Sequence, residues 1–314
     1  MSFSGDGVQL ITVGDDGAVR LWLAASGKPL DVLTGHAGAA SKVAPLADGS
    51  VLSGGADNLA LVWETRPQWK LVARIGPSAE NPLDVSMSPM VDRVLCLAFS
   101  PDGTKLAAGG GEPSRSGQVQ IWDVAGRSLI RELAEAHSDT VFDVEFSRDG
   151  KTLVSGAADK FVKTFDVETG KFIRGYEGHT NHVLGVSMKA DGSAIASSGA
   201  DNAVKLWNTA TGEQIRTISG FNKQVTDVDY IGVQDLLVTC GGDPQTRVYN
   251  AGNGTPKRSF DGSKDFVYAA VASRDEGVVA SAGEDGVIRV WNGTNGEVIA
   301  TFEPAVASNQ TAAK

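Results

Sequence analysis

Residues 178–208 read GHTNHVLGVSMKADGSAIASSGADNAVKLWN. Short runs of β-branched and small apolar residues alternate here with Gly, Asp and Ser, which is typical of short strands joined by tight turns. A further strand-like segment, Gln214–Ile218, follows the Thr211-Gly212 turn. The segment therefore predicts four strands, at Val183–Met188, Ala194–Ser197, Ala203–Trp207 and Gln214–Ile218.

The end of this segment recurs along the whole chain. An Asp precedes an aromatic residue by six positions in most copies, and one copy has Ser116 in place of the Asp. The aromatic residues are Trp22, Trp63, Trp122, Phe165, Trp207, Tyr249 and Trp291, spaced by 41, 59, 43, 42, 42 and 42 residues. A period of about 40–45 residues with four strands per unit predicts a β-propeller. We expect an all-β, seven-bladed propeller with four-stranded antiparallel blades.

The dipeptides of the repeat resemble a known family. Gly178-His179 with Leu206-Trp207-Asn208, and Gly35-His36 with Val62-Trp63-Glu64, are similar to the glycine-histidine and tryptophan-aspartate pairs of the WD-repeat (β-transducin-like) family. The resemblance extends over seven copies between residues 3 and 303. It implies the propeller fold and, for most members, binding of other proteins.

The resemblance also implies a buried hydrogen-bonded set in each blade, made of His, Ser or Thr, Asp and Trp. The matching residues are His36, Ser53, Asp57 and Trp63; His137, Ser155 and Asp159; and His179, Ser197, Asp201 and Trp207. Phe165 cannot donate the indole N–H, and Phe221 and Ser263 replace the His in blades six and seven. We prefer this structural role to a hydrolase site, because a nucleophile must reach its substrate.

The two ends of the chain depart from the repeat. Phe3–Gly7 resembles only the end of an innermost strand and its turn, so blade one is expected to lack that strand or to belong to a longer chain. Residues 1–303 are predicted to form the propeller. Residues 304–314 are polar and small, and we expect a flexible C-terminal tail there.

The amino-acid composition limits the classes of molecule that this chain is expected to bind. The net charge of -10 argues against nucleic acid, because phosphate binding needs clustered positive charge. The two cysteines, Cys96 and Cys240, fit no metal spacing, and four histidines spread over separate blades make a metal site improbable. No apolar run is long enough to cross a membrane, so membrane insertion is not expected. We predict no cofactor and no metal.

Two insertions interrupt the repeat, at residues 76–91 and at residues 109–117. The second carries Glu112 and Arg115. It leads into a strand and has no Gly-Lys-Ser/Thr, so it is no phosphate-binding loop. Loops on rigid scaffolds often carry function. Either Glu112 and Arg115 contact a partner, or they form a local ion pair at a loop tip.

The resemblance places partner contacts on the top face of the ring, at positions beside the first Val of each innermost strand. Large side chains at such positions are typical of binding hot spots. Some of them could instead fill the central channel or pack between blades. With the insertion-loop pair, the predicted contacts are Arg93, Leu95, Glu112, Arg115, Thr140, Phe142, His182, Leu184, Gln224, Phe266 and Tyr268.

These features favour a non-catalytic scaffold that binds a peptide or partner domain on the top face. The alternative is an accessory domain of a larger redox or hydrolytic enzyme, whose partner would be a domain fused upstream in a longer parent chain. Residues 112–117 and 136–142 resemble bacterial, planctomycete-like proteins that join a c-type cytochrome to WD repeats, although the chain has no CxxCH motif. That resemblance implies a periplasmic setting, whereas a cytoplasmic one is equally compatible with the sequence.

Overall fold

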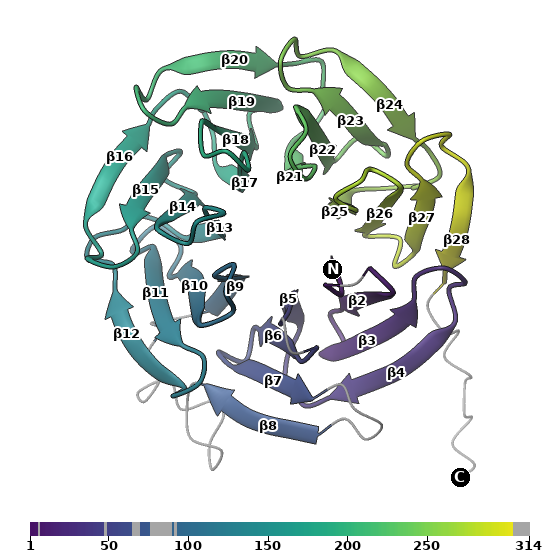
Figure 1. Cartoon of the computed structure of the whole chain (residues 1–314), viewed down its shortest axis with the longest axis horizontal. Helices are drawn as coiled ribbons and strands as arrows, with labels where there is room; N and C mark the ends of the chain where they lie inside the picture. The colour runs from purple at the N-terminus through teal and green to yellow at the C-terminus, as the bar shows by residue number, and fades with distance from the viewer. Residues whose placement is uncertain (6, 47–48, 65–69, 76–89, 91–92, 304–314) are drawn as a thin grey trace.

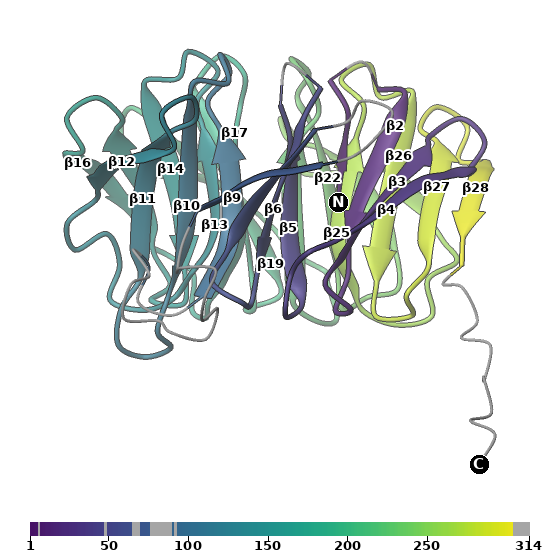
Figure 2. The same cartoon turned by 90° about the horizontal axis from the view of Figure 1, so that it is seen from below.

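A computed structural model of the chain describes residues 1–5, 7–46, 49–64, 70–75, 90 and 93–303. Seven four-stranded antiparallel sheets surround a central axis (Figure 1), which confirms the predicted all-β, seven-bladed propeller. The strands run between the two faces of the ring (Figure 2). The predicted tail, residues 304–314, and the insertion at residues 76–91 lie, apart from Met90, outside the described residues.

Each blade consists of four strands that are consecutive in the sequence. Blade one contains β1 (Ser2–Phe3), β2 (Gln9–Val13), β3 (Ala18–Leu23) and β4 (Pro29–Thr34). Blade two contains β5 (Ala40–Pro45), β6 (Val51–Gly55), β7 (Ala60–Glu64) and β8 (Lys70–Ile75). Blade three contains β9 (Arg93–Phe99), β10 (Lys105–Gly111), β11 (Gln118–Asp123) and β12 (Ser128–Glu132). Blade four contains β13 (Val141–Phe146), β14 (Thr152–Ala157), β15 (Val162–Asp166) and β16 (Phe172–Tyr176).

The remaining three blades follow the same order, with the first strand of each nearest the axis. Blade five contains β17 (Val183–Met188), β18 (Ala194–Gly199), β19 (Ala203–Asn208) and β20 (Gln214–Ile218). Blade six contains β21 (Val225–Tyr230), β22 (Leu236–Gly241), β23 (Thr246–Asn250) and β24 (Pro256–Phe260). Blade seven contains β25 (Val267–Ala272), β26 (Val278–Gly283), β27 (Ile288–Asn292) and β28 (Val298–Phe302).

The expectation that blade one lacks its innermost strand is wrong. Ser2 pairs with Ile11 and Phe3 pairs with Leu10, so a two-residue β1 is present. A turn aligns the two strands, since the N–H of Ser4 donates to the carbonyl of Gln9 at 2.9 Å. Phe3 also packs into the apolar cluster between blades seven and one. Two paired residues and one partly buried ring are enough to place a strand too short to recognise by its periodicity.

The core of the ring lies between the blades. Each apolar cluster combines residues of two neighbouring blades; in one of them Tyr176 of blade four packs on Trp207 of blade five. The second strand of each blade is largely buried on both faces, as the fully buried β18 illustrates. Because a single sheet cannot cover both of its own faces, the blades stabilise one another around the ring.

Arginines near the outer rim also join neighbouring blades. Arg174 in β16 donates to the carbonyl of Thr211 in blade five at 3.0 Å. Arg131 in β12 and Arg216 in β20 make the same contact with the turns of blades four and six, at 2.9 and 3.0 Å. Three consecutive blade interfaces therefore share one hydrogen-bonding arrangement. Among the described residues there is no helix whose length and apolar character would let it cross a membrane.

Candidate functional site

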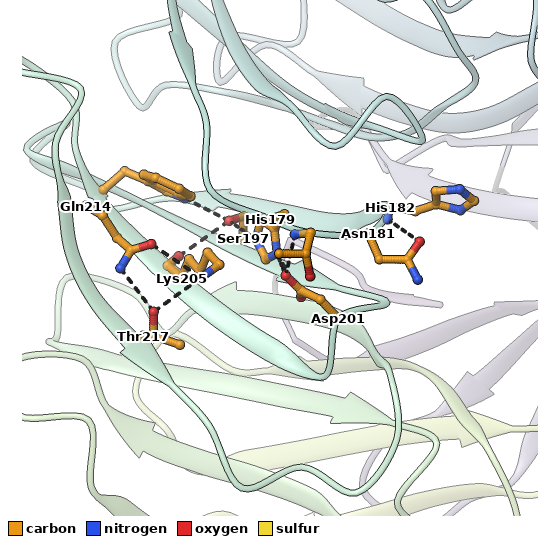
Figure 3. Close-up of polar contacts among 10 residues, drawn as sticks. His179, Asn181, His182, Ser197, Asp201, Lys205, Gln214 and Thr217 are labelled. Carbon is orange, nitrogen blue, oxygen red and sulfur yellow. Dashed lines mark hydrogen bonds and ion pairs between the residues drawn. The ribbon is translucent and has the colours of Figure 1, made fainter.

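The recurring His, Ser, Asp and Trp residues form hydrogen-bonded sets inside the blades, and Figure 3 shows the set of blade five. In blade five, His179 Nδ1 lies 2.9 Å from Asp201 Oδ1, and its Nε2 lies 2.8 Å from Ser197 Oγ. Trp207 Nε1 donates to the same Ser197 Oγ at 2.8 Å. Burial lowers the pKa of His179, so the ring is neutral and joins the carboxylate to the hydroxyl. This set links the turn after β18 to the strands on either side.

Blade two repeats the arrangement with the same residue types. His36 Nδ1 lies 2.9 Å from Asp57 Oδ1 and Nε2 lies 2.8 Å from Ser53 Oγ, which accepts from Trp63 Nε1 at 2.9 Å. The hydroxyl of Ser53 is completely buried. A substrate could not reach such an atom without unfolding of the blade, whereas the hydrogen bonds join the turn to its neighbouring strands.

Blade four keeps three of the four residues. His137 Nδ1 lies 2.9 Å from Asp159 Oδ1, and its Nε2 lies 2.7 Å from Ser155 Oγ. Phe165 occupies the aromatic position, is buried, and offers no indole N–H to the hydroxyl. Ser155 Oγ also lies 3.5 Å from the carbonyl oxygen of Lys163, as Ser197 Oγ does from that of Lys205 in blade five. The hydrogen-bonded set therefore tolerates loss of its last member.

An arginine replaces the histidine in the other blades that have a turn aspartate, which the sequence analysis missed. Arg247 Nη1 lies 3.1 Å from Asp243 Oδ2 in blade six, and Arg289 Nη2 lies 2.8 Å from Asp285 Oδ2 in blade seven. Arg20 pairs with Asp16 in the same way in blade one. The signal was present in the sequence as an Arg four positions after the turn Asp.

A cavity of about 610 Å³ opens at the mouth of the channel, on the face that carries the blade-to-blade connections. The expected partner-binding residues of blades three to seven converge on it, although they are far apart in the sequence. Those that line it are Arg93, Leu95, Thr140, Phe142, His182, Leu184, Gln224 and Tyr268. The structure therefore brings eight of the predicted contact residues to one place.

The other three predicted contact residues lie beside the cavity. Arg115 pairs with Glu112 within the insertion loop, so these two side chains form the local ion pair. Their neighbours Pro113 and Ser114 line the cavity. Phe266 stacks on Tyr268, with ring centroids 6.3 Å apart, and Lys223 Nζ lies over the Phe266 ring, 4.7 Å from its centroid. Phe266 therefore supports the exposed Tyr268 ring.

Charged residues at the floor were also missed from the sequence. Lys42 and Asp227 line the cavity from β5 and β21. Lys42 Nζ lies 3.7 Å from Asp143 Oδ1, and the Asp143 carboxylate raises the pKa of Lys42, so the ammonium stays charged. The signal was a charged residue at the third position of the innermost strand in both blades.

The channel carboxylates hydrogen-bond to the next blade. Asp143 Oδ2 accepts from the N–H of Val186 at 2.9 Å, and Asp227 Oδ2 accepts from the N–H of Ala270 at 3.0 Å. Each bond joins residues 43 positions apart. An innermost strand has no sheet partner on its channel side, so these carboxylates satisfy N–H groups that the blade cannot pair itself.

The described residues offer few groups suited to metal binding or to thiol chemistry. No group of three or more His, Cys, Asp or Glu side chains within the described ranges is placed to hold a metal. Cys96 and Cys240 are buried free thiols, and burial raises the pKa of both, which disfavours the reactive thiolate.

Comparison with known proteins agrees with the architecture. The family model "WD domain, G-beta repeat" matches residues 1–22, 27–64, 90–123, 127–166, 170–208 and 254–292. Among similar curated proteins, a poly(A)+ RNA export protein of Schizosaccharomyces pombe is 40% identical over 85 residues, which is 26% of this chain and 23% of that protein.

Two further relatives are similar over shorter stretches. The U3 small nucleolar RNA-associated protein 12 of Saccharomyces cerevisiae is 36% identical over 72 residues, covering 23% of this chain and 7% of its own. An intraflagellar transport protein 122 homolog of Xenopus tropicalis is 41% identical over 66 residues, which is 21% of this chain and 5% of that protein. The chain thus spans less than a quarter of each relative's length.

These three relatives are eukaryotic and none is named as a cytochrome, so they lend no support to the bacterial, cytochrome-linked resemblance or to a redox or hydrolytic accessory role. The matched repeats cover most of the seven blades. The hydrogen-bonded sets recur where the repeat pattern places them. The chain belongs to the WD-repeat, or G-beta repeat, family of β-propeller proteins.

Proposed function

We propose that this propeller is a non-catalytic scaffold that binds a protein partner, either a peptide or a domain, in the cavity at the channel mouth. The observation that carries the proposal is the convergence of Leu95, Phe142 and Leu184 from three blades, facing Tyr268 across one cavity. Tyr268 is 53% exposed, although it is a large aromatic side chain. Aromatic and aliphatic side chains around a concave surface are typical of protein-binding sites.

Rigid placement of these side chains supports the proposal. Phe142 lies against His182 with ring centroids 6.1 Å apart, and the hydroxyl of Tyr268 donates to Glu284 at 3.1 Å. Side chains already held in position lose little freedom when a partner binds, which favours affinity. The serine hydroxyls that could suggest catalysis are buried within the blades, away from this cavity.

Direct contact with nucleic acid is not part of the proposal, although two relatives are named for RNA export and for a small nucleolar RNA. The net charge of the chain is -10. Phosphate backbones are bound through clusters of Lys and Arg, and an acidic surface repels them. A role near RNA would therefore pass through a protein that binds the RNA.

Site-directed photo-crosslinking tests the proposal. A photo-reactive residue at Asn181, exposed beside the cavity, should capture one discrete partner, whereas the same residue at Glu213 on the opposite face should not. The Phe142→Ala/Tyr268→Ala variant should lose this product and keep its unfolding temperature. The matched control is Ile173→Ala/Ile215→Ala, which removes exposed apolar side chains from the outer strands. A partner that still crosslinks through Asn181 in the cavity variant would contradict the proposal.

A further inference from the structure

Three Asn-Gly pairs occur in the sequence, at or beside the turns between the third and fourth strands of blades six and seven. An asparagine before a glycine is chemically labile, because glycine has no side chain to hinder attack of its nitrogen on the neighbouring amide. The structure holds the three pairs in different ways, which predicts different rates of reaction. The pairs are Asn253-Gly254, Asn292-Gly293 and Asn295-Gly296.

Asn253 is exposed in the turn between β23 and β24. Its Oδ1 accepts from the N–H of Thr255 at 2.9 Å, so the side chain folds back over the following peptide as in other Asx turns. This places the amide carbon of Asn253 on the side of the Gly254 nitrogen. The Gly254 N–H donates to the carbonyl of Asn250 at 2.7 Å, but the turn is exposed and water can replace that acceptor.

Thr255 supplies a second donor to the same oxygen. Its hydroxyl lies 2.7 Å from Asn253 Oδ1. When the Gly254 nitrogen attacks the amide carbon, negative charge develops on Oδ1, and both Thr255 donors already point at it. Donors placed in this way lower the barrier to acyl transfer. The turn therefore activates the side-chain amide of Asn253.

Asn295 occupies the equivalent position in blade seven without this activation. Its Oδ1 accepts from the N–H of Glu297 at 2.9 Å, as in blade six. The Glu297 side chain offers no second donor, and its carboxylate accepts from Asn295 Nδ2 at 2.8 Å. A carboxylate beside the amide opposes negative charge on Oδ1 and holds the nitrogen that must leave.

Asn292 is activated but cannot easily be attacked. Its Oδ1 accepts three hydrogen bonds. However, Gly293 is buried, and its N–H donates to the carbonyl of Gly277 at 2.9 Å. A Cβ on Gly293 would lie 1.9 Å from the carbonyl oxygen of Glu276, so the backbone is closely packed there. The Gly293 nitrogen is thereby held away from the amide.

We propose that Asn253 is a site of spontaneous deamidation, and that its product loosens the joint between blades five and six. The Gly254 nitrogen forms a bond to Asn253 Cγ and gives up its proton. The bond from Cγ to Nδ2 breaks, and the amide nitrogen leaves with a proton as ammonia. Water then opens the resulting succinimide to aspartate or isoaspartate.

The joint is affected because Arg216 contacts the same turn. Arg216 Nη2 donates to the carbonyl of Gly252, directly before Asn253, at 3.0 Å. Isoaspartate carries the main chain through its side-chain carbon, which adds a methylene to the backbone of the turn. The widened turn moves the Gly252 carbonyl away from Arg216, and blades five and six lose this contact at their outer rim.

Peptide mapping by mass spectrometry, on protein aged at mildly alkaline pH, tests the site. In the folded protein Asn253 should react at least about fivefold faster than Asn295, the effect of one hydrogen bond on a barrier, and Asn292 should react slowest. In urea the three rates should become similar, because the turns are lost. Thr255→Val should slow the reaction of Asn253 about fivefold, whereas the matched Thr294→Val in blade seven should not.

Hydrogen exchange tests the loosened joint. The modified fraction, isolated by ion exchange, should exchange faster in β24 than fresh protein. Asn253→Thr, which copies Thr211 of blade five, should not change on ageing. A rate at Asn253 no higher than at Asn295, or unchanged in Thr255→Val, would overturn the proposed site. Equal exchange of β24 before and after modification would overturn its effect on the joint.

Discussion

Glu145 Oε2 accepts a hydrogen bond of 2.6 Å from the backbone N–H of Met188 in the next blade. The two residues are 43 positions apart, as are Ser187 and Tyr230, where the Ser187 hydroxyl accepts from the Tyr230 N–H at 3.0 Å. Side chains on one innermost strand thus satisfy backbone groups on the following one. Such contacts couple the blades at the wall of the channel, where no sheet partner is available.

The first prediction concerns the pH dependence of stability. The pKa of Glu145 is raised by burial from 4.5 to about 8, so the folded protein keeps a proton that the unfolded chain releases between these values. Its contribution is complete below pH 4.5 and is lost as the pH rises through 8, and the free energy of unfolding falls over that range. Glu145→Gln keeps the acceptor without ionising, and should therefore flatten this part of the profile.

Urea denaturation of both proteins across this range provides the measurement. The stability gained by Glu145→Gln should grow with pH and then level off above the folded-state pKa. Glu213→Gln, at an exposed position on the opposite face, is the control and should follow the wild-type profile. An effect of Glu145→Gln that is equal at both ends of the range would show that the carboxyl group ionises normally.

The second prediction concerns the indole hydrogen bond of blade five. Trp207→Phe leaves the buried Ser197 hydroxyl without its donor at 2.8 Å. Trp122→Phe removes the same volume from blade three, where the described residues provide no acceptor for the indole. We expect Trp207→Phe to lose about 1–3 kcal/mol more unfolding free energy than Trp122→Phe, measured by chemical denaturation. Equal losses would mean that packing alone accounts for the tryptophan.

The third prediction concerns the arginine that replaces histidine in blade six. Asp243 is 6% exposed, and Arg247→Leu leaves its carboxylate without a countercharge. The variant should lose about 2–4 kcal/mol, because an unpaired buried charge is costly. Asp243→Asn should be less harmful in the Arg247→Leu background than in the wild type, as a double-mutant cycle would reveal. Additive losses would indicate that the two side chains do not interact.

The fourth prediction separates backbone strain from crowding at the outer rim. Gly212 has a φ of +81°, and a Cβ there would lie 2.9 Å from Arg174 Cδ. Gly192 has a φ of +72° with nothing within 4 Å. Both Ala variants should lose about 1–2 kcal/mol from the left-handed conformation, and Gly212→Ala should lose more. Thermal unfolding should show that Arg174→Ala removes this excess; if it does not, the Arg174 contact is too soft to matter.

Much of the candidate site could be predicted from the sequence, because the position of a residue within its repeat predicts the face of the ring on which it lies. Phe142 and Tyr268 occupy equivalent positions in their repeats, so the seven-fold pattern placed both on one face of the ring. Lys42 and Asp227 were missed, because nothing in their own repeats shows that β5 and β21 face each other across a channel. Arg20, Arg247 and Arg289 each follow a turn Asp by four positions, and this spacing can be read from the sequence. Their ion pairs with these Asp residues became evident only from the geometry of the turns.

The amino-acid sequence alone determined the number of blades, the strand order of blades two to seven and the hydrogen-bonded sets inside blades two, four and five. These features depend on residues within about 40 positions of one another, and the repeat presents them seven times. Only the tertiary structure decided what lies between blades: the two-residue β1, the bonds from Glu145 to Met188 and from Arg174 to Thr211, and the charge balance of the channel. Closure of the ring brings together innermost strands that no local pattern relates, and their buried charged groups act on one another across the channel.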